Sequence, residues 1–164
     1  MLATFPSLAS NPNATVHSVE EFNALDSSVE TIIVDNNGCN DRSFTVLNLT
    51  RFVNLKVFEV GDFSFSYVNE VHMIGLPELE RVVIGENCFS QCKDVFYANP
   101  SGDFYLKDCD KLRELRISVS SFISYASCVI EGNNRLEVIE MGKLYDWGYN
   151  FFFASLEMKS CYDD

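Results

Sequence analysis

The stretch that decides the fold is LKVFEVG at residues 55–61, because its apolar skeleton returns along the chain. LERVVIG occupies residues 79–85, LRELRIS residues 112–118 and LEVIEMG residues 136–142, and a weaker copy, VETIIVD, occupies residues 29–35. Each copy has apolar residues at its first, fourth and sixth positions, and three of the five copies end in Gly. Self-similarity at a fixed period predicts a repeat protein whose units bury their apolar sides against one another.

A second apolar segment lies eight residues before each of the four stronger copies. Both segments alternate apolar and variable residues with a period of two, which predicts half-buried strands. The Gly that ends the first segment predicts a turn with positive φ. We therefore expect a strand-rich repeat solenoid with two short strands per coil of about 24 residues. The second segments are residues 47–49, 71–73, 104–106, 128–130 and, near the end of the chain, 156–158.

An aromatic residue follows the leading Leu by ten positions in three copies, at Phe65, Phe89 and Phe122. The fourth copy has Asp146 at this position, beside Trp147. Residues that share one phase of a repeat are expected to stack on one another. We therefore predict a buried column of Phe65, Phe89 and Phe122, with one ring per coil.

The spacing of the copies predicts the domain organisation. Leu79 and Leu112 are 33 residues apart, and turn-forming residues gather at 99–102, so we predict a loop insertion at 93–102. Residues 28–164 are expected to form a single solenoid domain of four to five repeats. Residues 1–27 are expected to be an irregular N-terminal tail, with a helical spacing at 16–25 that suits a cap on the first coil.

Composition excludes two classes of partner. The chain has 24 acidic and 12 basic residues, a net charge of −12, whereas phosphate binding needs a basic stripe. No apolar run approaches the ~18 residues of a membrane span. We therefore predict neither nucleic-acid binding nor membrane insertion, and we interpret the scattered charge as serving solubility.

The run Ile84-Gly85-Glu86-Asn87-Cys88-Phe89-Ser90-Gln91-Cys92 resembles the isoleucine-glycine, alanine-phenylalanine, cysteine signature of BspA-like leucine-rich repeats. A looser copy is GDFSF at residues 61–65, and the resemblance spans residues 29–161. Ser118 in place of Gly and Asp146 in place of Phe depart from the family pattern. The resemblance implies a curved, leucine-rich-repeat-like right-handed superhelix that acts as an adhesion or protein-interaction scaffold.

The chain has six cysteines: Cys39, Cys88, Cys92, Cys109, Cys128 and Cys161. Cys109 and Cys161 share a phase with Leu76, and Cys128 shares one with Val71, so we predict mostly buried free thiols. A disulfide or a metal site remains an alternative, although Cys88 and Cys92 lack a second ligand pair. Reduced thiols and the lack of a convincing secretory signal at the start favour an intracellular setting. The sequons at Asn13 and Asn48 point the other way, and the compartment stays open.

The sequence offers few residues that could form a catalytic group, because its only histidines are His17 and His72. His17 falls in the irregular start, and His72 is expected to point outward between Val71 and Met73, away from the thiols. We predict no catalytic residue, no cofactor and no metal. The alternative is a β-solenoid hydrolase or lyase, which convergent acids near Asp103, Asp108 and His72 would favour.

The outward positions of the first segments form the candidate partner-binding face. We predict a non-catalytic leucine-rich-repeat-like scaffold that binds another protein or a cell-surface macromolecule there, with Arg81 and Arg116 as hot spots. One ladder is expected to hold Val57, Arg81, Glu114 and Val138, and the next Glu59, Val83, Arg116 and Glu140.

Overall fold

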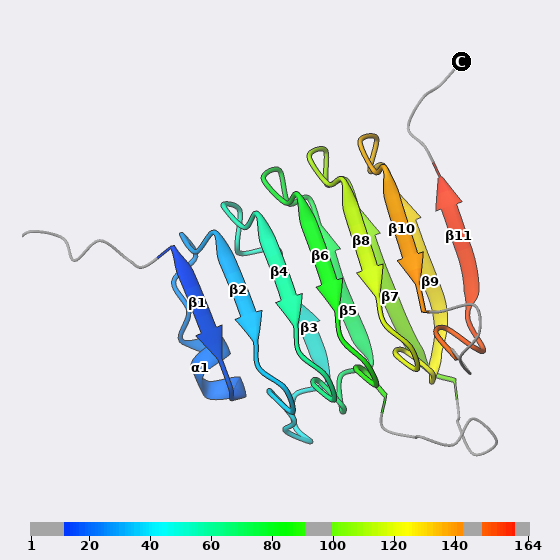
Figure 1. Cartoon of the computed structure of the whole chain (residues 1–164), viewed down its shortest axis with the longest axis horizontal. Helices are drawn as coiled ribbons and strands as arrows, with labels where there is room; N and C mark the ends of the chain where they lie inside the picture. The colour runs from blue at the N-terminus through cyan, green and yellow to red at the C-terminus, as the bar shows by residue number, and fades with distance from the viewer. Residues whose placement is uncertain (1–11, 91–99, 143–148, 160–164) are drawn as a thin grey trace, which may run out of the picture.

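Two parallel β-sheets, stacked face to face, make up the fold (Figure 1). The computed structural model describes residues 12–90, 100–142 and 149–159. Sheet A has the strand order β1-β2-β4-β6-β8-β10, and sheet B the order β11-β9-β7-β5-β3. The chain therefore alternates between the sheets, and each sequence repeat contributes one strand to each sheet. The predicted strands are confirmed at both apolar segments.

The strands are short and follow the sequence copies closely. Sheet A consists of β1 (Asn13–Val16), β2 (Thr31–Val34), β4 (Val57–Val60), β6 (Arg81–Ile84), β8 (Glu114–Ile117) and β10 (Val138–Met141). Sheet B consists of β3 (Val46–Asn48), β5 (Glu70–Ile74), β7 (Gly102–Lys107), β9 (Tyr125–Glu131) and β11 (Ser155–Lys159).

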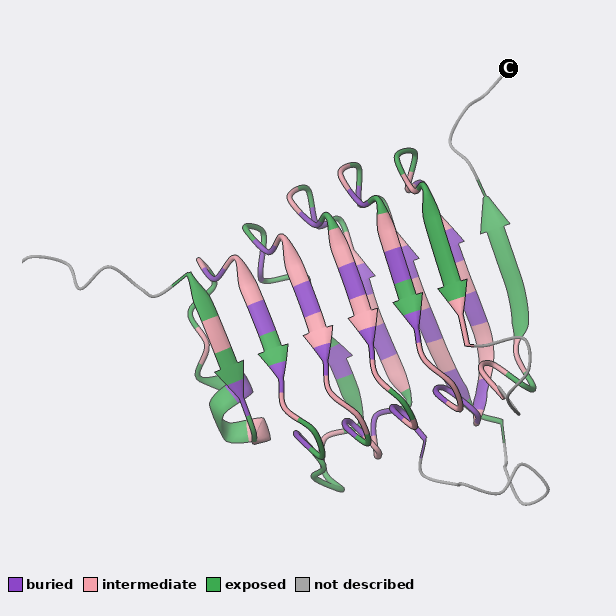
Figure 2. Ribbon diagram, in the orientation of Figure 1, coloured by how far each residue is buried: buried purple, intermediate pink, exposed green. Residues whose placement is uncertain are grey.

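Equivalent residues of successive repeats lie directly opposite one another. In sheet A, Phe58 pairs with Val82, and Val82 pairs with Leu115. In sheet B, Val71 pairs with Phe104, and Phe104 pairs with Cys128. These side chains are buried between the sheets, as the alternating colours of the central strands in Figure 2 show. The core is thus a stack of equivalent layers.

The predicted Phe column is confirmed. Phe65 stacks on Phe89 with ring centroids 5.2 Å apart, and Phe89 stacks on Phe122 at 4.5 Å. The column continues to Phe151, whose ring lies 4.7 Å from that of Phe122. Phe151 follows Leu136 by fifteen residues rather than ten, so the fourth copy carries its ring after five extra residues. Asp146, which occupies the position ten residues after Leu136 where the other copies have Phe, lies outside the described residues.

Within the predicted irregular tail of residues 1–27, the described part from residue 12 onward contains a strand and a helix. Asn13–Val16 form β1, which pairs in parallel with β2, because Ala14 and Val16 supply the same inward alternation as the later copies. The predicted helical cap corresponds to α1 (Val19–Asn23), with Ser18 as its N-cap. Phe22 is buried from α1 against the edges of Phe52 and Phe65. This helix therefore covers the first core layer.

The predicted loop insertion at 93–102 is only partly covered, because residues 91–99 lie outside the described ranges. At its end the prediction needs correction: Gly102 is buried and begins β7 opposite Tyr125. A Cβ there would lie 2.9 Å from the Tyr125 ring and 2.9 Å from the Asn69 carbonyl oxygen. Gly102 is thus part of the packed sheet and not of a dispensable loop.

The reason for Gly at the end of the first segment also differs from the expected positive φ. Among these glycines only Gly142 has a positive φ, of 70°. Gly61 and Gly85 are required by close packing, because a Cβ would lie 2.5 Å from Asn36 Oδ1 and Asp62 Oδ1, respectively. Those oxygens accept hydrogen bonds from the backbone N–H groups of Asp62 and Glu86, both 2.8 Å long.

A polar ladder runs beside the Phe column. It consists of Ser64, Cys88 and Ser121, each of which immediately precedes a ring of the column. Ser64 Oγ donates to the Asp35 carbonyl oxygen at 2.8 Å, and Ser121 Oγ donates to that of Gly85 at 2.8 Å. The Cys88 thiol donates to the Gly61 carbonyl oxygen at 3.1 Å. Each side chain therefore donates a hydrogen bond to a part-buried carbonyl of the preceding repeat.

The Phe column predicts a large cost for truncating one ring. We expect Phe89→Ala to lower the free energy of unfolding by about 3–5 kcal/mol, because it leaves a cavity between two stacked rings. The matched control is Phe63→Ala, a half-exposed residue that also has positive φ, which we expect to cost about 1 kcal/mol or less. Denaturant unfolding measures both, and equal losses would contradict the buried column.

The close approach at Gly85 predicts that a single methyl group is harmful. We expect Gly85→Ala to cost about 1–3 kcal/mol of unfolding free energy, because its Cβ overpacks against Asp62. Ser118 occupies the same phase in the next repeat, where the neighbour is the longer Glu86, and we expect Ser118→Ala to change stability by less than about 0.5 kcal/mol. Thermal and urea unfolding would contradict this account if Gly85→Ala were as stable as the parent chain.

Candidate binding face on sheet A

The outward side chains of sheet A lie in the two ladders that the sequence predicted. Val57 pairs with Arg81, Arg81 with Glu114, and Glu114 with Val138. In the second ladder Glu59 pairs with Val83, Val83 with Arg116, and Arg116 with Glu140, through the same strand pairs. Period-two alternation places all eight side chains on one face, opposite the core.

The charged residues of this face form one chain of ion pairs. Arg81 Nε donates to Glu114 Oε2 at 2.9 Å, and Arg81 also pairs with Glu59. Arg116 pairs with both Glu114 and Glu140. The order across four strands is therefore Glu59, Arg81, Glu114, Arg116 and Glu140. Both guanidinium groups are neutralised within the chain, which changes their expected role as hot spots.

Glu114 lies at the centre of this chain of ion pairs. The hydrogen bond from Arg116, together with the positive charges of Arg116 and Arg81, lowers the pKa of Glu114 below its ordinary value of 4.5. The pKa of Arg116 is raised in turn, first by its hydrogen bond and charge interaction with Glu114 and then by Glu140. Glu114 and Arg116 are therefore both charged at neutral pH.

Aliphatic side chains lie between these charges. Val57 and Val83 are half-buried, and Val138 is exposed. Ile33 of β2 is also exposed and pairs with Glu59, so it extends the second ladder by one residue. The sequence interpretation missed Ile33 because it followed only the four stronger copies, although VETIIVD places Ile33 in the same phase as Glu59. The face thus offers apolar area between paired charges.

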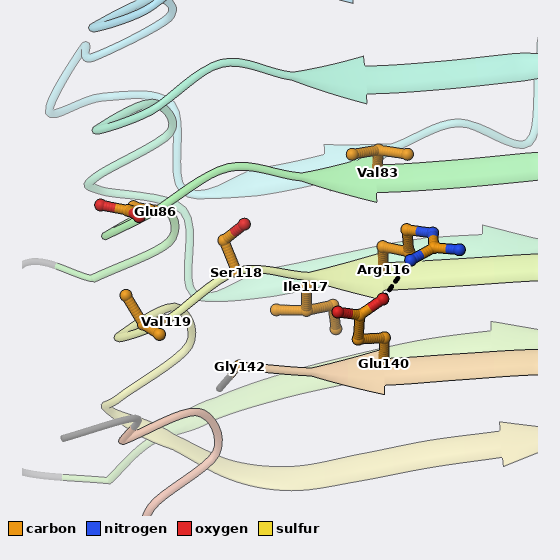
Figure 3. A pocket seen from close by; sticks show the side chains of 8 residues that line it. All are labelled: Val83, Glu86, Arg116, Ile117, Ser118, Val119, Glu140 and Gly142. Atoms are coloured by element: carbon orange, nitrogen blue, oxygen red, sulfur yellow. Dashed lines mark hydrogen bonds and ion pairs between the residues drawn. The ribbon is translucent and has the colours of Figure 1, made fainter. Parts of the chain in front are cut away.

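A pocket opens where the strands of this face end (Figure 3). Val83, Arg116 and Glu140 extend into it from the strands, and Glu86, Ser118 and Val119 line it from the connections that follow. A second, more open depression is lined by Ile33, Glu59 and Val83, with His17 and Asp35. Val83 lines both hollows and therefore lies between them on the face.

His17 lies at the edge of the face and not in an irregular tail. Its Nδ1 is 2.6 Å from Asp35 Oδ2, and both side chains are well exposed. The signal that could have placed it is the apolar pair Ala14 and Val16, which marks β1 immediately before it. The pair joins the first two strands of sheet A at the surface.

His72 and Cys88 are not brought together. His72 lies on the outer face of sheet B, where its Nε2 is 2.7 Å from Glu70 Oε1 and its ring stacks on Tyr105 at 5.3 Å. Cys88 is fully buried beside the Phe column, and burial raises the pKa of its thiol to about 12. Asp108 is exposed in the turn before buried Cys109. These positions supply no base and nucleophile within reach of each other.

The predicted core positions of Cys109 and Cys128 are confirmed, and Cys39 and Cys88 are buried as well. All four are free thiols, and desolvation raises their pKa values to about 11 for Cys109 and about 12 for the other three. Cys92 and Cys161 lie outside the described residues. In the described ranges, no group of three or more His, Cys, Asp or Glu residues is arranged to hold a metal ion.

Two further findings bear on partners. Among the helices of the described residues, none has the length and apolar character of a membrane span. Comparisons with protein-family models, with curated proteins and with solved structures found no significant match. Interpretation of the face therefore depends on its own geometry.

The charge network predicts a pH dependence of stability. The pKa of Glu114 is lower in the folded chain than in the unfolded chain. Its ion pairs therefore stabilise the fold at any pH above the unfolded pKa, and this contribution is lost as the pH falls through the folded pKa. We expect Glu114→Gln to be less stable than the parent at pH 7, with the difference shrinking as pH falls below 4.5. Urea unfolding from pH 7 to pH 3 measures this.

The control for this experiment is Glu137→Gln. Glu137 Oε1 lies 3.5 Å from Arg113 Nη1, and this ion pair is more exposed than those of Glu114. We expect this substitution to change stability less than Glu114→Gln at pH 7, because exposed pairs contribute little. A Glu114→Gln deficit that is the same at pH 3 and pH 7 would contradict the pairing.

Proposed function

We propose that this chain is a leucine-rich-repeat-like solenoid with a right-handed coil and that it acts as a non-catalytic scaffold binding another protein. Four observations support the fold: strands that alternate between two parallel sheets, in-register pairing, the Phe column and the polar ladder beside it. Right-handed connections are the rule for parallel strands. The spacing Leu-x-x-Leu-x-Leu-x-x-Asn-x-Leu of leucine-rich repeats also fits LERVVIGENCF at residues 79–89.

The fit to that spacing differs among repeats. Among the four copies in which this position is described, residues 29–39 have Asn37 and residues 79–89 have Asn87 at the Asn position, whereas the copies that begin at Leu55 and Leu112 have Phe63 and Ser120 there. All four residues have positive φ, between 54° and 60°. The shared backbone conformation supports one repeat geometry despite the changes of side chain.

The observation that carries the function is the composition of the sheet A face. Its two arginines are already paired with three glutamates of the same face, so a partner does not need to supply acidic groups to them. The exposed or half-buried Ile33, Val57, Val83 and Val138 provide apolar area among them. A surface that mixes apolar side chains with satisfied polar groups is common in protein interfaces. We therefore propose a protein as the partner.

The paired charges determine which substitution is informative. Arg81→Glu or Arg116→Glu would place a carboxylate between two others and would destabilise the face itself. Val83 is the better position, because it borders both hollows and takes part in no ion pair. Val83→Arg removes none of the charged residues of the network and places a long charged side chain at the centre of the face, between Glu59 and Arg116.

The experiment compares Val83→Arg with Val129→Arg, which makes the same change at a half-buried outward Val in β9 of sheet B. A partner is first captured with the parent chain and purified, and its affinity for each variant is then measured by biolayer interferometry. We expect Val83→Arg to weaken binding at least about tenfold, or about 1.4 kcal/mol, and Val129→Arg to bind like the parent. Equal binding by both variants would contradict the proposed face.

A further inference from the structure

The two Asn-x-Thr sequons of the chain each lie on the first strand of one of the two sheets. Asn13-Ala14-Thr15 falls in β1, an edge strand of sheet A, and Asn48-Leu49-Thr50 starts at the last residue of β3, an edge strand of sheet B. The Asn and the Thr of both sequons are exposed. The structure thus brings both potential acceptors for N-linked sugar to the surface.

Asn48 is the acceptor whose surroundings the structure describes on both sides along the chain. Leu47 and Leu49 are buried in the core, so alternation directs the Asn48 side chain outward from sheet B. The Leu49 N–H donates to the His72 carbonyl oxygen, so the backbone groups of Asn48 face away from β5. Within the described residues, no strand pairs with that outer edge of β3. A group attached to Asn48 would extend away from the core and from the sheet's hydrogen bonds.

The sequon at Asn48 forms a local hydrogen-bonded turn. Asn48 Oδ1 accepts from the Thr50 N–H at 2.9 Å and from the Thr50 hydroxyl at 2.7 Å. Both bonds use the carboxamide oxygen, and Nδ2 donates to no acceptor among the described residues. Turns of this kind depend only on neighbouring residues, so this one can form before the sheets assemble. The side-chain nitrogen is left open to modification.

The buried cysteines do not oppose passage through an oxidising compartment. Cys39, Cys88, Cys109 and Cys128 are free thiols buried in the core. Burial raises the pKa of Cys109 to about 11 and the pKa values of the other three to about 12. Oxidation requires an accessible thiolate, whereas buried structural thiols are inert. These four residues therefore remain reduced in the folded chain in either kind of compartment.

We propose that Asn48 carries an N-linked oligosaccharide. In the transfer, Asn48 Nδ2 forms a bond to the anomeric carbon of a sugar carried on a polyprenyl pyrophosphate, and the bond from that carbon to the pyrophosphate oxygen breaks. The electron pair of the broken bond leaves with the pyrophosphate, and Nδ2 releases one proton to solvent. The lipid-linked oligosaccharide is the co-reactant, so the chain passes through a compartment that supplies it.

A glycan at Asn48 would cover the open edge of β3. Unpaired edge strands are templates for pairing with another chain, and Val46 of the same strand is apolar and 41% exposed. N-linked glycans are bulky and solubilising, so one at Asn48 would oppose edge-to-edge association. It would lie on sheet B and leave the proposed partner-binding face of sheet A accessible.

Peptide mass spectrometry of the full chain, isolated from the cells that naturally produce it, tests the modification. Trypsin cleaves after Arg42, Arg51 and Lys56, so Asn48 and Asn54 fall in separate peptides, 43–51 and 52–56, each with a single Asn. Peptide-N-glycosidase in heavy-oxygen water converts a glycosylated Asn to a labelled Asp. We expect the label at position 48. Asn54 is exposed and also precedes a Leu, but it has Lys56 where the sequon has Thr50, and it should stay unlabelled.

An unmodified peptide 43–51 from the native chain would overturn the proposal, as would a glycan at Asn13 alone. Three variants test the sequon in the full chain, directed into the secretory pathway of a eukaryotic host by a cleavable signal peptide. We expect Asn48→Gln and Thr50→Val to lose the glycan at position 48, and Thr50→Ser, which keeps the hydroxyl, to retain it. Circular dichroism checks that all three keep the strand content of the parent. A Thr50→Val chain still modified at Asn48, or a folded Thr50→Ser chain without the glycan, would also contradict the assignment.

Discussion

Parallel, in-register pairing between successive repeats is the constraint on which the rest of this structure depends. A strand of four or five residues cannot satisfy its backbone groups alone, so each strand takes its hydrogen bonds from the repeats before and after it. Examples are the Gly61 N–H on Val34 and the Gly85 N–H on Val60. Apart from a register shift between Gly102 and Asp103 in the β7–β9 pair, this pairing brings equivalent residues side by side. The chain must therefore choose, at every phase of the repeat, side chains that tolerate a copy of themselves as a neighbour.

Different phases meet this requirement in different ways. Aromatic rings stack face to face, as Phe89 and Phe122 do with planes 6° apart. The phase beside the rings holds small polar groups, Ser64, Cys88 and Ser121, which reach the preceding backbone. Charged phases alternate in sign: Glu30, Lys56, Glu80, Arg113 and Glu137 are backbone neighbours in that order. Like charges directly opposite one another would repel. The alternation of sign is therefore explained by the stacking of repeats and is not by itself evidence of a binding site.

That reasoning changes how the sheet A face is interpreted. The ion pairs of Arg81 and Arg116 satisfy the stacking condition and leave no unpaired charge at these two residues to attract a partner. Apolar side chains are not required on an outward face for stacking, and Ile33, Val57, Val83 and Val138 therefore carry more information about docking than the arginines do.

The sequence by itself determined the repeat, the two strands in each unit, the inward and outward residues and the column of Phe65, Phe89 and Phe122, because period-two alternation and phase are local properties. It could not place Phe151, since an insertion shifts the numbering without shifting the position in space. It gave the wrong reason for Gly61 and Gly85, because the clash with Asn36 and Asp62 exists only when two repeats stack. It indicated Arg81 and Arg116 as hot spots, whereas only the tertiary structure shows that both are paired with acids of the same face. Contacts within a repeat follow from sequence spacing, but contacts between repeats depend on register, insertion length and side-chain reach, which only the assembled sheets decide.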